Sequence, residues 1–283
     1  MLCVIDELKI CYSAGKDDLK CLESVEAGSY ADVFGYRLYR GVNDRFQFYF
    51  EVLEDRGPVA QLRFGHYTDT DDSVMYVYFK VLNHILYNEE RLRRVLALPS
   101  ELGLVFNNFT EIDLAYDSPL NTPALIKKMM RDKSVTTIIN GKAVRDRKSV
   151  LRGVSFEYSS TLNRLNHPTV TIKQAKAVNN KSAGITVQAY DKKAEIDNCS
   201  GKQYILDYHG RPKRLYRLEV RLHNQELKDY FAKRHVVPGI DILFDRGLLN
   251  ELFLYHLGAV IRFTRERRKL DWGELLGMRC QGI

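Results

Sequence analysis

Hydrophobic and polar residues alternate with a period of two along several segments of the chain, a pattern typical of half-buried β-strands. These segments are residues 8–12, 46–53, 59–64, 74–79, 104–117, 154–158, 169–172, 185–190 and 215–222. A Gly-Pro pair at 57–58 marks a turn between two of them. The alternation therefore predicts a structure in which β-sheet is the main component.

Other regions have apolar residues at helical spacing. The spacing predicts a helix from 79 to about 98 that Pro99 ends, and a second helix over 123–133. Residues 225–283 are expected to be mainly helical, with one or two amphipathic helices over 240–269, so that the basic run 262–269 is a solvated helix end. Residues 197–214 are expected to form a polar connection.

Strands and helices in this order predict an α+β fold with a central antiparallel sheet, flanking helices and a helical C-terminal part. No low-complexity linker or repeat divides the chain, so one domain over 1–283 is expected. At 283 residues and 45% hydrophobic composition, the chain has enough apolar side chains for a sizeable core, which excludes a disordered protein.

Cysteine usage and hydropathy exclude several classes of protein. Five cysteines without a Cys-x-x-Cys pair give neither a disulfide framework nor a zinc site. No signal peptide and no run of about 18 apolar residues is present, so we expect a cytoplasmic protein without a membrane partner.

Charge distribution points to a polyanionic partner. The net charge is +7, and lysine and arginine are concentrated in 125–152 and 202–221, whereas 51–72 is acidic. The basic stretches 142–152, 173–181 and 211–221 suit contacts to phosphates, although a solvated charged loop is an equally good interpretation.

Three of the predicted strands carry polar side chains on one face. Asp113 and Asp117 alternate with apolar residues in one strand, Tyr190 ends a second, and Glu219 lies between two arginines in a third. Taken singly, each fits an ordinary sheet with one solvated face. A functional site requires that the three polar faces belong to adjacent strands.

If these faces converge, their chemistry is coherent. Carboxylates without cysteine or paired histidine ligands favour a hard cation such as Mg²⁺ or Mn²⁺, which polarises a phosphodiester oxygen. The unperturbed pKa of a phenol is about 10, so nearby positive charge, such as that of Lys192 or Lys193, would help Tyr190 act as a nucleophile.

The motifs Thr-Glu-Ile-Asp113-Leu-Ala-Tyr-Asp117, Tyr190-Asp-Lys192-Lys-Ala-Glu195 and Tyr-Arg-Leu-Glu219-Val-Arg-Leu occur in the order and rough spacing of the Rep_trans family. The resemblance covers about residues 100–225. Members of this family are rolling-circle replication initiators of small plasmids, related to phage initiation factors and to relaxases of integrative conjugative elements.

The resemblance implies an enzyme that nicks and rejoins origin DNA, single-stranded or in a hairpin. Tyr190 would be the nucleophile, would become linked to the 5′ phosphate and would leave a 3′ hydroxyl for a host polymerase. Asp113 and Glu219, and with them Asp117, match the metal-binding acids of the family. Initiators of this type often dimerise, so a homodimer is implied as well.

Other nicking enzymes fit the sequence less well. The seven histidines include no His-hydrophobic-His pair, which argues against a histidine-ligated nuclease site. No Walker A loop is present, so unwinding is expected to come from a host helicase. The alternatives left open are a conjugative relaxase and a non-catalytic protein in which Tyr190 stacks on a base of single-stranded nucleic acid.

Overall fold

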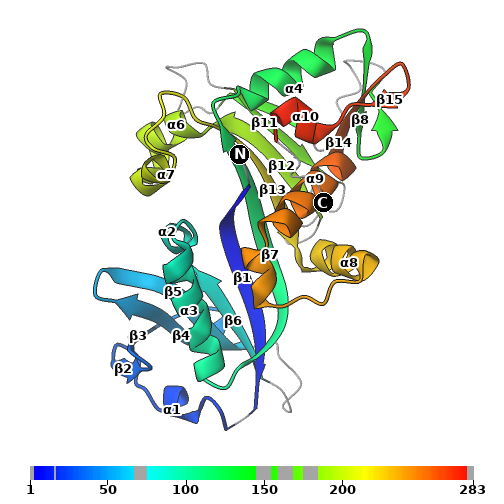
Figure 1. Ribbon diagram of the computed structural model, residues 1–283. Coiled ribbons are helices and arrows are strands. Elements are labelled where there is room, and N and C mark those ends of the chain that lie inside the picture. The colour runs from blue at the N-terminus through cyan, green and yellow to red at the C-terminus, as the bar shows by residue number, and fades with distance from the viewer. Residues whose placement is uncertain are drawn as a thin grey trace. The chain divides into compact units, whose positions relative to one another are not determined.

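The computed structural model describes residues 3–15, 17–66, 75–144, 154–158, 168–174 and 184–278, with only the backbone described for 154–158 and 168 (Figure 1). The described chain forms two compact units. The first contains residues 1–4, 113–236 and 242–283, and the second contains residues 5–112 and 237–241. The sequence had predicted one domain, with no linker between parts; the long strand β7 contributes residues to both units.

The second unit is an antiparallel sheet with three helices. Its elements are β1 (Val4–Ala14), α1 (Lys20–Glu23), β2 (Tyr30–Val33), β3 (Tyr36–Gly41), β4 (Phe46–Glu54), β5 (Gly57–His66), β6 (Met75–Val81), α2 (Asn83–Leu86), α3 (Glu89–Glu101) and the first part of β7 (Val105–Ser118). The strands lie in the order β7-β1-β6-β5-β4-β3-β2, and the pairings from β1 to β2 are all antiparallel. Buried apolar residues on alternate positions, such as Phe50, Leu62 and Phe79, form its core.

The first unit holds a second group of strands and most of the helices. Its elements are the end of β7, α4 (Thr122–Arg131), β8 (Val135–Ile139), β9 (Lys142–Ala143), β10 (Val154–Tyr158), β11 (Pro168–Lys173), β12 (Thr186–Asp191), α6 (Lys192–Glu195), a π-helix η2 (Ile196–Ser200), α7 (Gln203–Tyr208), β13 (Tyr216–His223), α8 (Asn224–Arg234), a 3₁₀ helix η3 (Ile240–Phe244), α9 (Arg246–Val260), β14 (Ile261–Arg265), β15 (Arg268–Lys269) and α10 (Trp272–Leu276).

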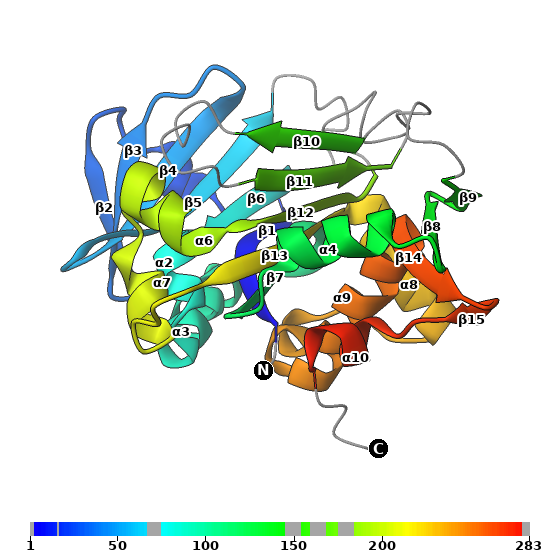
Figure 2. The same cartoon turned by 90° about the horizontal axis from the view of Figure 1, so that it is seen from above.

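Strands β10 to β13 lie side by side in chain order and pair in antiparallel fashion, with β7 next to β13 (Figure 2). Helices α4 and α9 both contact β12 and β13. Val187, Ala189, Leu218 and Val220 are fully or almost fully buried, so the apolar sides of the two strands pack in the core, as the alternation predicted. The side of β12 that carries Tyr190 is the opposite one.

The α+β class and the antiparallel sheet are confirmed, as is the C-terminal helical part. Some boundaries were wrong. The expected helix over 79–98 begins as strand β6, and α3 continues past Pro99 to Glu101. The expected polar connection 197–214 contains η2 and α7.

The basic run 262–269 is not a helix end. It forms the hairpin of β14 and β15, with Glu266 and Arg267 at positive φ in the turn. Phe263, fully buried on β14, packs against Trp272, so alternating burial decided in favour of a strand. The helical pattern of α9 had been extended too far along the chain.

Candidate active site

The three predicted polar faces lie on adjacent strands, in the order β12-β13-β7. In the pairing of β12 with β13, Tyr190 is opposite Arg217, and Gln188 is opposite Glu219. Neighbouring strands are about 4.8 Å apart, and directly opposite residues point to the same face. The required convergence of Tyr190, Glu219 and the β7 acids is therefore present in the fold.

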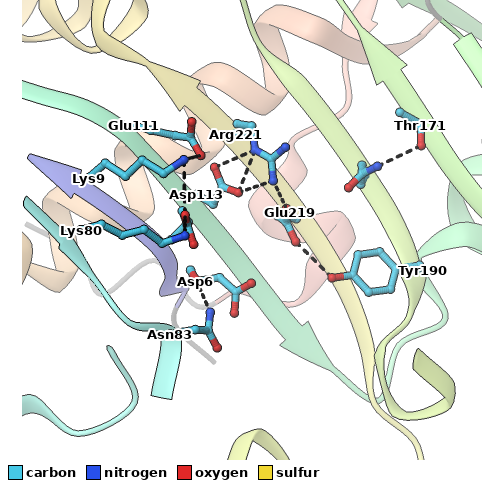
Figure 3. Close-up of polar contacts among 12 residues, drawn as sticks. Asp6, Lys9, Lys80, Asn83, Glu111, Asp113, Thr171, Tyr190, Glu219 and Arg221 are labelled. Atoms are coloured by element: carbon cyan, nitrogen blue, oxygen red, sulfur yellow. Dashed lines mark hydrogen bonds and ion pairs between the residues drawn. The ribbon is translucent and has the colours of Figure 1, made fainter. Parts of the chain in front are cut away.

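A hydrogen bond joins the phenol of Tyr190 to a carboxylate. Tyr190 Oη donates to Glu219 Oε2 at 3.1 Å (Figure 3). The tyrosine is half-buried, whereas Glu219 is only 6% exposed. A carboxylate in this position can accept the phenolic proton, which is the relation between a nucleophile and its general base.

Arg221 connects that carboxylate to the first acid of β7. Its Nε and Nη2 lie 2.9 and 2.7 Å from Asp113 Oδ2, and its Nη2 lies 3.7 Å from Glu219 Oε1 (Figure 3). The side chain of Asp113 is 3% exposed but that of Arg221 is 41% exposed. One guanidinium group, partly open to solvent, thus bridges two buried acids.

Asp117 belongs to a separate, fully buried ion pair. Its Oδ1 accepts from Arg217 Nε at 2.7 Å, and its Oδ2 accepts from Arg217 Nη2 at 2.6 Å; both side chains are 0% exposed. His209, which follows α7, lies 3.1 Å from Oδ2 through Nε2. Burial raises the pKa of Asp117, but the charge and hydrogen bonds of Arg217 and the contact with His209 outweigh burial and hold that pKa below its usual range.

Lys192 lies at the start of the short helix that follows the tyrosine. The Asp191 side chain caps α6 by accepting from Ala194 N at 2.9 Å, which turns the chain directly after Tyr190. Lys192 Nζ is 5.7 Å from the centroid of the Tyr190 ring and 2.8 Å from Glu195 Oε2. Its side chain is 3% exposed, so a buried positive charge lies over the ring.

Lys193 has a different environment from Lys192. Its Nζ pairs with Asp197 Oδ2 at 2.7 Å, and both side chains are at least one third exposed. Of the two lysines considered from the sequence, Lys192 lies over the Tyr190 ring and Lys193 pairs with Asp197 instead.

The predicted metal ligands differ in how well they fit a cation. Asp113 and Glu219 share the cation Arg221, and these two carboxylates are the ones that would hold Mg²⁺ or Mn²⁺. Both oxygens of Asp117 are committed to the buried Arg217 and to His209, so this carboxylate suits a metal less well. Among the residues that the structure describes, no group of three histidine, cysteine or acidic side chains is placed to hold a metal.

The sequence missed Arg217, Arg221 and His209 as parts of the site. The two arginines flank Glu219 at alternate positions, and that spacing already placed all three on one face. The carboxylates on the neighbouring strand are the partners that such a face requires. Nothing in the sequence signals His209, because its contact with Asp117 spans 92 positions.

The basic residues predicted to contact phosphates differ in their exposure. In 211–221, Arg211, Lys213 and Arg214 are exposed and Arg221 is partly exposed, whereas Arg217 is fully buried and cannot offer its charge to phosphates. Residues 145–152 and 175–181 of the other two stretches lie outside the described part of the chain.

Comparison with protein-family models gives no match, and a search of curated proteins finds no related sequence. Within the described ranges, no helix is both long and apolar enough to cross a membrane.

Proposed function

We propose that this protein nicks and rejoins DNA with Tyr190 as the nucleophile. The observation that carries the proposal is the hydrogen bond from Tyr190 Oη to Glu219 Oε2, a buried carboxylate. A phenol needs a base to attack phosphorus at neutral pH, and a carboxylate at 3.1 Å is within reach of its proton.

The Tyr190 oxygen attacks the phosphorus of a phosphodiester while Glu219 accepts the phenolic proton, and the bond between phosphorus and the 3′ oxygen breaks. The 3′ oxygen leaves as a hydroxyl after taking up a proton, and the 5′ phosphate stays on the tyrosine. The reverse reaction rejoins the strand, because the phosphotyrosyl ester conserves the energy of the broken bond.

Positive charge around the phenol supports this reaction. Lys192 over the Tyr190 ring stabilises negative charge that develops on the phenol, and Arg221 can turn its partly exposed guanidinium toward a phosphoryl oxygen. Asp113 and Glu219 would hold Mg²⁺ or Mn²⁺, which supplies further polarisation of the phosphoryl group when bound. Arg217 and Asp117 fix the strand opposite Tyr190.

The biological reaction that fits is initiation of rolling-circle replication at origin DNA in the cytoplasm. The freed 3′ hydroxyl would serve a host polymerase, with strand separation by a host helicase. A relaxase of an integrative conjugative element would carry out the same strand transfer, so the two roles differ in the DNA that is served. The three motifs that resemble the Rep_trans family support either.

Transfer of label from DNA to protein tests the nucleophile. An oligonucleotide that carries the nick site and a 3′ label should leave its label on the wild-type protein, in the presence of Mg²⁺ or Mn²⁺. With a 5′ label, the same DNA should give a shortened fragment that a polymerase extends. The DNA next to the gene is the first source of such sites.

Tyr190→Phe should abolish both products, and Tyr208→Phe is the matched control. Tyr208 is an exposed tyrosine of α7 whose ring packs against that of His209, and loss of its hydroxyl alone should leave nicking normal. A phosphotyrosyl adduct on Tyr190→Phe would show that another residue is the nucleophile. If wild type binds the DNA but never forms the adduct, Tyr190 only stacks on a base, and the protein is a binding protein.

Glu219→Gln keeps the hydrogen-bonding shape but removes the base. General-base contributions are on the order of 10²–10⁴-fold, so the nicking rate should fall within that range while DNA binding is retained. A Glu219→Ala variant with unchanged rate and unchanged metal dependence would remove Glu219 from the site.

A further inference from the structure

The second unit carries a hollow that the reaction at Tyr190 does not use. Its volume is about 1150 Å³. The β2–β3 hairpin, the turn between β4 and β5 and helix α3 form its walls, so it lies entirely within residues 30–94. Aromatic rings and arginines dominate the lining.

Charge in the hollow is partly cancelled and partly available. Arg37 pairs with Asp32 at 3.2 Å, and Arg91 pairs with Glu54 at 2.7 Å. The remaining lining charges are those of Arg56, Arg94 and Asp55, all exposed. No described carboxylate forms an ion pair with Arg56 or Arg94, which leaves an excess of positive charge for an anionic ligand.

Two exposed aromatic rings lie beside these arginines. Tyr30 is 58% exposed and Phe34 is 57% exposed, and both line the hollow. Arg37 lies over the Tyr30 ring at 5.8 Å from its centroid. Exposed aromatic rings interleaved with arginines are the surface that stacks bases and contacts the phosphates between them.

The backbone conformation at Phe34 does not favour a phenylalanine in this turn. Phe34 and Gly35 form the two-residue turn of the β2–β3 hairpin, with φ of 48° and 80°. A turn with two positive φ angles favours Asn-Gly, and a bulky residue in the left-handed region costs roughly 1–2 kcal/mol. A large apolar side chain that is strained and more than half exposed gains little from burial, which favours a role for Phe34 in contact with a ligand.

We propose that this hollow binds a segment of single-stranded DNA, with bases stacked on Phe34 and Tyr30 and phosphates contacted by Arg56 and Arg94. The choice of DNA as the strand rests on the proposed function, whereas the chemistry of stacking and charge does not. Such a surface would bind origin sequence in addition to the nick site and contribute to the selection of the substrate strand.

Equilibrium binding of a fluorescein-labelled oligothymidylate to the full-length chain tests the proposal by fluorescence anisotropy. Phe34→Asn should raise the Kd about 5-fold or more, as expected from the loss of one stacked base. The same variant should unfold at the same or a higher temperature, because Asn-Gly suits the turn better. Weaker binding together with undiminished stability distinguishes a ligand contact from a structural role.

Arg56→Ala with Arg94→Ala should reduce the dependence of log Kd on log salt concentration by about 1.4, at about 0.7 for each phosphate contact to a single strand. Arg93→Ala is the matched control, since Arg93 is a 52% exposed neighbour on α3 that pairs with Glu89 and does not line the hollow. Its salt dependence should equal that of wild type.

Binding by the Tyr190→Phe chain separates this proposal from the proposed function. The effect of Phe34→Asn should be the same in that background, whether or not the protein nicks DNA. The proposal is overturned if Phe34→Asn and the double arginine variant bind as wild type does, or if duplex DNA or oligouridylate binds more tightly than oligothymidylate.

Discussion

Removal of the Asp117 carboxylate should destabilise the first unit strongly, because it leaves a charged Arg217 in the core. Both side chains are fully buried, and two hydrogen bonds of 2.6 and 2.7 Å join them. Loss of one partner of a buried ion pair costs on the order of 3–5 kcal/mol, since the other charge stays desolvated and uncompensated. We expect Asp117→Ala to lower the free energy of unfolding by about that amount.

A double-mutant cycle gives the sharper result. Asp117→Leu with Arg217→Met replaces the pair by apolar side chains, which is often neutral or stabilising, so the double variant should be more stable than either single variant. Arg217→Met alone leaves a buried carboxylate that prefers its neutral form, and its loss of stability should therefore shrink at low pH.

Fluorescence of Trp272 follows this unfolding in the correct unit. It is the single tryptophan of the chain, it is 3% exposed, and its Nε1 donates to Ile261 O at 2.8 Å. Urea titration of the Trp272 signal reports the unfolding of the first unit alone. A local signal is needed because a two-state treatment of a chain with two units would not hold. Single-variant costs under about 1 kcal/mol, or single costs that simply add in the double variant, would refute a buried, coupled pair.

Two further predictions concern buried ionisable side chains, His256 and Lys192. Burial lowers the pKa of His256 from 6.5 to about 4, so between these values the unfolded chain binds more protons and stability falls as pH falls. Between pH 7 and 5 the loss in the free energy of unfolding amounts to about 2 kcal/mol. In urea titrations, His256→Phe should remove this pH dependence, while His235→Asn, at an exposed αL position, should retain it. An unchanged pH dependence in His256→Phe would contradict a lowered pKa of His256. Lys192→Met should slow nicking about 2- to 30-fold, as expected for a cation over a ring, whereas Lys193→Met should nick at the wild-type rate; equal rates for the two variants would count against a role for Lys192.

The sequence predicted the strands of the site because each has one strictly alternating apolar side. β7, β12 and β13 were all located within a few residues, and the side that carries Tyr190 and Glu219 followed from the period of two. The prediction failed where a pattern is compatible with two structures. Residues 262–269 directly follow the apolar helix α9, and they form a hairpin in which Phe263 is buried against Trp272.

Charge pairing was the least accessible part of the site. Asp113 and Asp117 look equivalent in sequence, because both lie on the same side of one predicted strand. In the structure, however, Asp113 pairs with the partly exposed Arg221 and Asp117 pairs with the fully buried Arg217. The difference arises from which residues of β13 lie next to β7 and from the cover that His209 provides, and both depend on contacts between residues about 100 positions apart. No periodicity carries that information.

The charges of the site favour the proposed divalent cation, although the described residues form no cage of three ligands. Asp113, Asp117 and Glu219 carry three negative charges against the two positive charges of Arg217 and Arg221, and Lys192 is balanced by Glu195. A phosphodiester adds one more negative charge, so the occupied site would have a net charge of about −2 in a poorly solvated environment. Turning Arg221 toward the phosphate does not change that sum, but a divalent cation neutralises it. We therefore expect Mg²⁺ or Mn²⁺ to enter with the DNA, at the two acids that Arg221 bridges, and not as a resident of the free protein.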